Sequence, residues 1–166
     1  MSTLLLMRHA KSDWYADVDR DHDRPLNARG ERSARVMGRL ITGEGLAPDL
    51  VISSTATRAA DTAHLAKRAG GWACPIRLDA DLYGGGPDTV VDVIASAGQA
   101  DRLLVVGHQP TWGWLATRLT GEAVDVRTAT VVVIDVPQGW RQVGSGGSLL
   151  AVHHPRDHFG GEYDAG

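Results

Sequence analysis

Short apolar runs and longer amphipathic stretches alternate along the chain. Each apolar run has only four to eight residues, and the runs are rich in leucine and β-branched residues, so they predict buried strands. The predicted strands are Thr3–Met7, Leu50–Ser53, Arg102–Val106, Ala129–Val136 and Ser148–His153. Because strands and helical segments alternate at this spacing, the pattern predicts an α/β fold with a mainly parallel sheet.

Four segments between the strands have the apolar spacing of an amphipathic helix. They are residues 27–42, 57–69, 88–97 and 111–120. We expect Asn27, Asp88 and Thr111 to cap the first, third and fourth helices, because short polar side chains accept hydrogen bonds from the first free N–H groups. Glycines at 70–71 and 121 are expected to end the second and fourth helices.

The inward faces of these helices follow from the same spacing. The predicted buried positions are Ala34, Met37, Gly38 and Ile41 in the first helix, Val91, Ile94 and Ala95 in the third, and Trp112, Leu115, Ala116 and Leu119 in the fourth. The last two strands are joined by a short polar stretch, which is typical of an antiparallel edge. Residues 155–166 are polar and contain glycine, so we expect a domain over 1–154 and a flexible tail over 155–166.

Composition narrows the class of protein. The chain has 166 residues, of which 43% are hydrophobic and 22% charged, as in one globular domain. No apolar run approaches the roughly 20 residues of a membrane helix, and no leader is recognised, so we expect a cytoplasmic protein. The net charge of −3 supplies no basic field for nucleic acid. A single cysteine, Cys74, excludes an internal disulfide and a multi-cysteine zinc site. Nothing in the sequence predicts an oligomeric state.

Polar residues follow three of the predicted strands. Arg8 and His9 come directly after the first strand, and Arg58 lies one turn into the helix after the second. His108 comes after the third strand and Gly107. Because ligands of parallel α/β sheets bind beyond the carboxyl ends of the strands, we expect these side chains to meet at one edge.

Two arginines and two histidines in one pocket suit phosphoryl transfer. Guanidinium groups match phosphoryl oxygens with strong bidentate hydrogen bonds. One neutral imidazole can attack phosphorus and the other can donate to a phosphoryl oxygen. The positive side chains can replace a metal ion, so neither metal nor cofactor is expected. Each residue alone is more typical of a loop or surface, and only the combination favours this chemistry.

Several segments resemble a known family. The stretches LLLMRHAKSDW, VISSTATRAADTA and VVGHQP, together with Asp-Arg-Pro-Leu-Asn-x-Arg-Gly at residues 23–30, resemble the histidine phosphatase superfamily, the phosphoglycerate-mutase-like group. The short chain, RHAKS and the DRPL segment look most like SixA-type phosphohistidine phosphatases. The resemblance covers about Thr3 to Gly121. It implies a single-domain three-layer sandwich, with helices on both faces of the central sheet.

The resemblance also implies roles for individual residues. It makes His9 the nucleophile and places Arg8, Arg58 and His108 around the phosphate. Relatives that use an acid carry glutamate in a Glu-Leu-Tyr pattern, and Asp81 is the best positional match, shorter by one methylene. Asp81 is therefore the expected proton donor, with a loop aspartate as the alternative.

Two positions depart from the family pattern, and one acidic segment needs an interpretation. Ala10 stands where most relatives have glycine, although alanine is common in the SixA-like subset, and Gln109 replaces the usual asparagine. The alternating aspartates of residues 17–23 lack the glycine and glutamate of a calcium loop, so we expect a solvated loop near the site entrance. Arg24 is expected either to point to the pocket or to pair with these aspartates, and pairing is favoured.

The expected function is a metal-independent phosphatase that works through a phosphohistidine intermediate, on protein phosphohistidine. The alternative substrates are small phosphate esters. A mutase is less favoured, because mutases generally carry insertions that a chain of this length has little room for. A non-catalytic phosphate-binding module is also less favoured, because the nucleophile and both arginines are present. The expected partner is thus a phosphorylated protein or a small phosphate ester, with no nucleic acid or membrane.

Overall fold

In the computed structural model, which describes residues 2–159, six strands form one sheet in the order β3-β2-β4-β1-β5-β6. The strands are β1 (Thr3–Arg8), β2 (Leu50–Ser54), β3 (Ile76–Asp79), β4 (Arg102–Gly107), β5 (Val131–Asp135) and β6 (Ser148–His153). The first four pair in parallel, whereas β5 runs antiparallel to both β1 and β6. The predicted mainly parallel sheet and its antiparallel edge are therefore confirmed.

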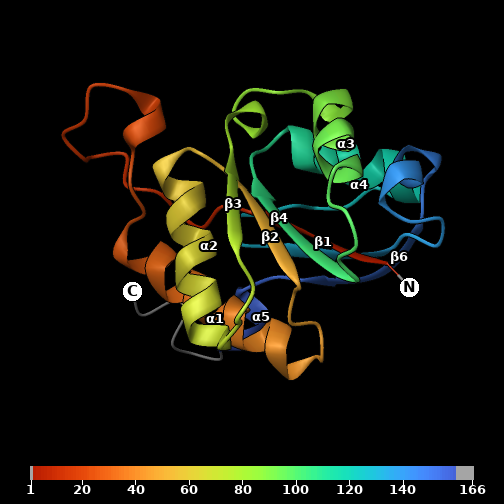
Figure 1. The fold of residues 1–166 in the computed structure, drawn as a ribbon. Helices are drawn as coiled ribbons and strands as arrows, with labels where there is room; N and C mark the ends of the chain where they lie inside the picture. Colours follow the sequence, from red (N-terminus) through yellow and green to blue (C-terminus); the bar gives the residue numbers. More distant parts are fainter. Residues whose placement is uncertain (1, 160–166) are drawn as a thin grey trace.

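Helices cover both faces of the sheet, as Figure 1 shows. The longer helices are α1 (Ala28–Gly43), α2 (Thr57–Gly70), α3 (Pro87–Ala95) and α4 (Thr111–Thr120), followed by the single turn α5 (Arg156–Phe159). Three short 3-10 helices are η1 (Asp21–Asp23), η2 (Ala80–Leu82) and η3 (Trp140–Ser145). Apolar residues of α1 and α2 pack on one face, and those of α3 and α4 pack on the other. This is the expected three-layer sandwich.

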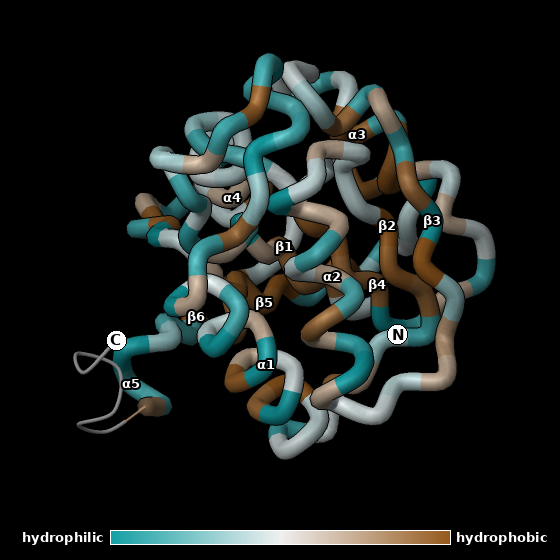
Figure 2. The backbone as a smooth tube through the Cα atoms, turned by 90° about the vertical axis from the view of Figure 1, so that its left-hand side faces the viewer, coloured by the Kyte–Doolittle hydropathy of each residue, from teal (hydrophilic) through white to brown (hydrophobic). Residues whose placement is uncertain are grey.

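The central strands are buried on both faces because their side chains alternate between two cores. Leu4 and Leu6 of β1 join the core beneath α3 and α4, whereas Leu5 and Met7 join the core beneath α1 and α2. In Figure 2 the central strands carry much of the hydrophobic colouring. A strand buried on both sides needs a continuous apolar run, which explains why β1, β2 and β4 stand out in the sequence.

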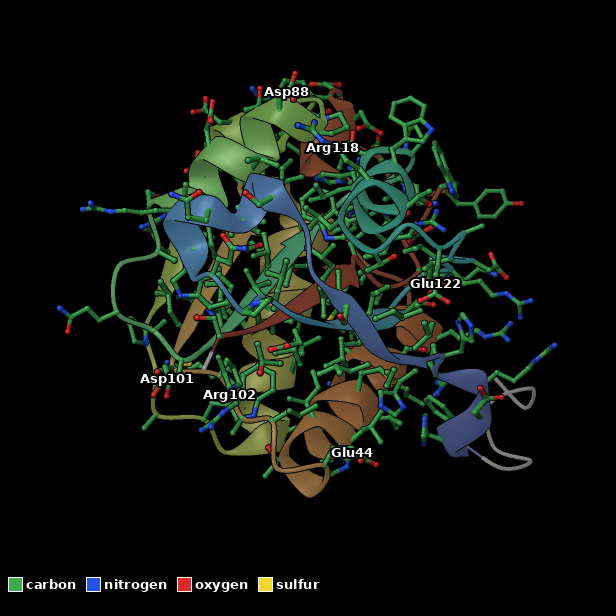
Figure 3. All side chains as sticks on the ribbon, turned by 90° about the vertical axis from the view of Figure 1, so that its right-hand side faces the viewer. Glu44, Asp88, Asp101, Arg102, Arg118 and Glu122 are labelled. Atoms are coloured by element: carbon green, nitrogen blue, oxygen red, sulfur yellow. The ribbon has the colours of Figure 1, made fainter. Side chains whose placement is uncertain are left out.

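Helix ends agree in part with the predicted caps. The Asn27 side chain accepts from the Gly30 N–H at 2.8 Å, so the cap of α1 is confirmed. However, α3 begins at Pro87 with Gly86 as its cap, and Asp88 instead pairs with Arg118 of α4. Figure 3 shows these two side chains directed toward each other between the helices. Proline suits a first helical turn, because it lacks the N–H that would otherwise be unpaired.

The start of α4 and the inward face of α3 are further corrections. Thr111 is not a cap, because Pro110 takes that position and the Thr111 hydroxyl donates to the Gly85 carbonyl at 3.1 Å. In α3 the fully buried residues are Val90, Val93 and Ile94. Val91 and Ala95 are only half-buried, because the buried stripe at i, i+3 and i+4 starts one residue earlier than expected.

The edge strand β3 and the end of the chain complete the fold. β3 has only four residues, none fully buried, so it lacks the apolar run that predicts a strand. Within the predicted tail, residues 156–159 form α5, and residues 160–166 lie outside the described part. Among the described residues, no helix has both the length and the apolar character needed to cross a membrane.

Candidate active site

The ends of three neighbouring strands bring the four predicted residues together. Arg8 is the last residue of β1 and lies beside Gly107 of the parallel strand β4, so His9 and His108 leave the sheet side by side. Their ring centroids are 5.3 Å apart. Arg58 enters from the first turn of α2, which follows β2. All four line one pocket of about 510 Å³, whose other lining residues are Lys11, Ser12, Trp14, Arg24, Tyr83, Gly84, Gln109 and Thr128.

Two glycines allow close packing next to the segments that carry His9 and His108. A Cβ atom on Gly30 would lie 2.0 Å from the Lys11 carbonyl oxygen, so glycine lets α1 pack directly against the loop after β1. A Cβ atom on Gly107 would lie 2.0 Å from the Trp112 ring, which is fully buried beneath the end of β4. Both contacts hold the histidine-bearing turns against rigid elements.

His9 is held as a neutral base with one nitrogen available. Its Nδ1 lies 2.7 Å from the Ala10 carbonyl oxygen, which can only accept, so Nδ1 carries the proton and Nε2 keeps its lone pair. The pKa of His9 is lowered to about 3, mainly by burial; the hydrogen bond to the Ala10 carbonyl opposes this shift, and the charges of His108, Arg58 and Arg8 add to it. At neutral pH Nε2 is therefore unprotonated and nucleophilic.

His108 is oriented by a serine from the neighbouring strand. Its Nε2 lies 2.8 Å from the hydroxyl oxygen of Ser54, which also accepts from the Ala56 N–H at 3.2 Å. We assign the Ser54 hydroxyl as the hydrogen-bond donor to Nε2. The neutral ring then carries its proton on Nδ1. Burial, and then the charge of Arg58, lower the pKa of His108 to about 4. The neutral ring can thus offer an N–H to a phosphoryl oxygen.

Asp21 of η1 accepts hydrogen bonds from three polar residues of the pocket. Its carboxylate accepts from Arg58 Nη2 at 2.9 Å, from the Tyr83 hydroxyl at 2.8 Å and from Arg24 Nη2 at 3.1 Å. Its carbonyl oxygen accepts from Arg58 Nη1 at 2.8 Å. Partial burial alone would raise the pKa of Asp21, but the hydrogen bonds from Tyr83, Arg24 and Arg58 outweigh it and lower the pKa to about 2. Asp21 itself does not line the pocket.

Several buried donors of the pocket have no hydrogen-bond partner among the described residues. They are Arg8 Nε, Arg24 Nη1, Arg58 Nε and His108 Nδ1. Leaving a buried donor unpaired costs about 1–3 kcal/mol, and charged groups cost more. Within the described part of the chain no Asp or Glu lines the pocket to pair with them. An oxyanion with several acceptor oxygens would satisfy these donors together.

Arg24 combines the two positions that the sequence leaves open. It pairs with Asp21 as expected, but it is also buried, lines the pocket and stacks 3.5 Å from the centroid of the Trp14 ring. The pocket thus has three guanidinium groups, not two. Lys11 and Ser12 also line it and could have been inferred from their places directly after Arg8-His9-Ala10.

The structure does not bring Asp81 to the other four predicted residues. Asp81 is exposed in η2, where its backbone N–H bonds the Asp79 carboxylate at 2.9 Å, and it does not line the pocket. Tyr83, two residues further on, reaches the site instead, with its ring centroid 5.6 Å from that of His108. Over residues 2–159 there is also no group of three or more His, Cys, Asp or Glu side chains that could hold a metal ion.

Comparisons with known proteins show which family the chain resembles. The model of the histidine phosphatase superfamily (branch 1) matches residues 4–83, which include Arg8, His9 and Arg58. An uncharacterized protein of Mycobacterium tuberculosis is 41% identical over 164 residues, covering 90% of this chain and 100% of the relative.

Solved structures show the same fold. A protein assigned as the phosphohistidine phosphatase SixA of Nakamurella multipartitia is 32% identical, with a TM-score of 0.82 over 93% of this chain and 96% of that one. The protein histidine phosphatase SixA in complex with tungstate is 20% identical, with a TM-score of 0.82 over 93% and 98% of the two chains, a likeness of fold. The chain belongs to the histidine phosphatase superfamily.

Proposed function

We propose that this phosphatase removes the phosphoryl group from phosphohistidine in proteins, through a phosphoryl group carried on His9 and without a metal ion. The observation that carries the substrate class is the set of lining residues. It supplies cationic and N–H donors for a phosphoryl group, but no carboxylic acid to protonate a leaving group.

In the first step His9 Nε2 attacks phosphorus while the bond from phosphorus to the leaving nitrogen breaks. Arg8, Arg58 and the N–H of His108 donate to the phosphoryl oxygens, where negative charge is held in the transition state. The second ring nitrogen of the substrate phosphohistidine, whose ordinary pKa is near 6.5, takes a proton from solvent before the bond breaks, so the leaving group departs as neutral imidazole. In the second step water attacks phosphorus, the bond to His9 Nε2 breaks, and phosphate leaves.

The absence of a lining carboxylate separates substrate classes. An alkyl phosphate releases an alkoxide, which is far too basic to leave unprotonated at neutral pH, so it needs a positioned acid. The Tyr83 hydroxyl is already donated to Asp21, and Asp81 lies outside the pocket. Phosphohistidine and aryl phosphates have leaving groups that depart without such an acid. Small alkyl esters are therefore the weaker alternative.

Exposed aromatic side chains at the pocket also favour a protein as the substrate. Trp14 lines it with 74% of its surface exposed, and the adjacent Tyr15 is 98% exposed. Exposed aromatic side chains of this kind are typical of surfaces that contact other proteins.

The proposal is tested with three substrates in the presence of EDTA: a phosphohistidine protein, an aryl phosphate and an alkyl phosphate. We expect the wild type to hydrolyse the first two, and alkyl phosphate at least about a hundredfold more slowly, the lower range for one missing general acid. His9→Ala should abolish turnover, whereas Asp81→Asn should retain it. Loss of activity with EDTA, equal turnover of alkyl phosphate, or an Asp81→Asn defect as large as that of His9→Ala would each contradict the proposal.

A further inference from the structure

A second, smaller pocket adjoins the active site and is lined mainly by basic side chains. Its volume is about 200 Å³, and its lining residues are Arg29, Arg127, Thr128, His154, Pro155 and Arg156. They come from the first turn of α1, the segment before β5, and the junction of β6 with α5. Thr128 lines this pocket and the active-site pocket as well, so the two cavities share a wall.

The ionisable side chains that line this second pocket are all basic. Three guanidinium groups and one imidazole lie around it, and none of its described lining residues is a carboxylate. His154 Nδ1 lies 2.7 Å from the Thr130 hydroxyl, which leaves Nε2 as its other nitrogen for a ligand. Guanidinium groups that line a cavity can donate several hydrogen bonds to an anion inside it.

The ion pair that Arg127 already makes does not prevent this role. Arg127 Nε donates to the Asp125 carboxylate at 2.8 Å, with 59% and 65% of the two side chains exposed. Ion pairs as exposed as this one add little to stability, so Arg127 can share its remaining N–H groups with a ligand at small cost.

We propose that the second basic pocket binds an acidic side chain of the phosphoprotein substrate while the phosphoryl group of the same substrate lies against His9. The inference rests on the proposed function, which supplies a polypeptide substrate. Carboxylates match guanidinium groups in the bidentate way that arginine favours. Because Thr128 lines both cavities, the two proposed binding sites adjoin each other.

The kinetic experiment uses two phosphohistidine peptides that differ only in flanking Glu or Gln residues. For wild type we expect KM to be about tenfold lower for the acidic peptide, the effect of roughly one charge-assisted hydrogen bond. Arg127→Gln and Arg156→Gln should remove this preference and leave kcat unchanged. Arg141→Gln is the matched control, because Arg141 is an exposed arginine in η3, which packs against α3 on the other face. Equal KM values for the two peptides with wild type would overturn the inference.

A binding measurement separates this inference from the proposed function. Enzyme loaded with tungstate is titrated calorimetrically with the unphosphorylated acidic peptide, which requires no turnover. Binding that is lost in the Arg127→Gln, Arg156→Gln double variant supports the second site, and absent or unchanged binding overturns it. If wild type instead hydrolyses no phosphohistidine substrate, the proposed function fails, whatever the titration shows.

Discussion

The Asp21 carboxylate accepts a hydrogen bond from Arg58 Nη2 at 2.9 Å, and the Asp21 carbonyl oxygen accepts from Nη1 of the same guanidinium at 2.8 Å. Asp21 therefore occupies one edge of Arg58, whose Nε has no partner among the described residues. Asp21 also accepts hydrogen bonds from Tyr83 and Arg24. These bonds connect the segment before α1 to residues that line the phosphate pocket.

The first prediction concerns the hydrogen bonds of the Asp21 carboxylate. Asp21→Asn should lower kcat/KM about tenfold, because a hydrogen bond to a charged group contributes roughly 1.5–3 kcal/mol and the backbone contact to Arg58 remains. Steady-state kinetics on an aryl phosphate measure it, with Asp19→Asn in the same loop as control. A rise in kcat/KM would show that the carboxylate competes with phosphate for Arg58 and does not position it.

The second prediction concerns Ser54 and the tautomer of His108. Ser54→Ala removes the hydroxyl that contacts His108 Nε2, so the ring proton is free to move to that nitrogen and the N–H aimed at phosphate is lost. We expect kcat to fall about ten- to a hundredfold, on the scale of other lost transition-state donors. Ser53→Ala is the control, because Ser53 is equally buried but bonds only the Ser54 carbonyl. Equal kcat values for the two variants would refute the role.

The third prediction is the protonation state of the two histidines. Because the pKa of His9 is lowered to about 3 and that of His108 to about 4, both rings are neutral from neutral pH down to about pH 5. NMR titration should find that the His9 and His108 rings do not titrate between pH 5 and 8. Their signals are assigned by His9→Ala and His108→Ala. A pKa near 6.5 for either ring would contradict the burial argument.

The same shifts predict how stability changes with pH. The pKa values of His9 and His108 are lower in the folded chain than the ordinary 6.5, so the unfolded chain binds more protons between about pH 6.5 and 3. Stability should therefore fall as pH decreases through that window, by at most about 1.4 kcal/mol per pH unit for each ring. Urea denaturation at pH 7, 6 and 5 measures this. The His9→Ala variant should show a shallower dependence, and an unchanged slope would refute the contribution of His9.

The sequence predicts those elements whose pattern lies within the element itself, and misses those that depend on contacts with distant residues. The strands β1, β2 and β4 carry continuous apolar runs, and the residues at their ends converge because parallel strands share an edge. The edge strand β3 reads Ile76-Arg77-Leu78-Asp79, half-exposed, and has no such run. The expected start of α3 is wrong, because Asp88 is a residue type that often caps helices but here forms an ion pair with Arg118 of α4.

Within the site, residues next to strand ends were predictable and long-range partners were not. Arg8 ends β1, and His9 and His108 directly follow β1 and β4, whereas Asp21 contacts Arg58 across 37 positions of sequence. Asp81 and Tyr83 lie in one short segment, and only the turn at η2 decides which of them reaches the pocket. No local pattern encodes such a choice, because it depends on where the loop is anchored by tertiary contacts.

The most direct measurement is to locate the phosphoryl group during turnover. Enzyme mixed with a phosphohistidine protein is quenched in alkali, where phosphorylated imidazole survives, and digested for mass spectrometry. The account predicts a phosphoryl group on His9 in wild type and none in His9→Ala. A phosphoryl group on His108 alone, or continued turnover by His9→Ala, would contradict it.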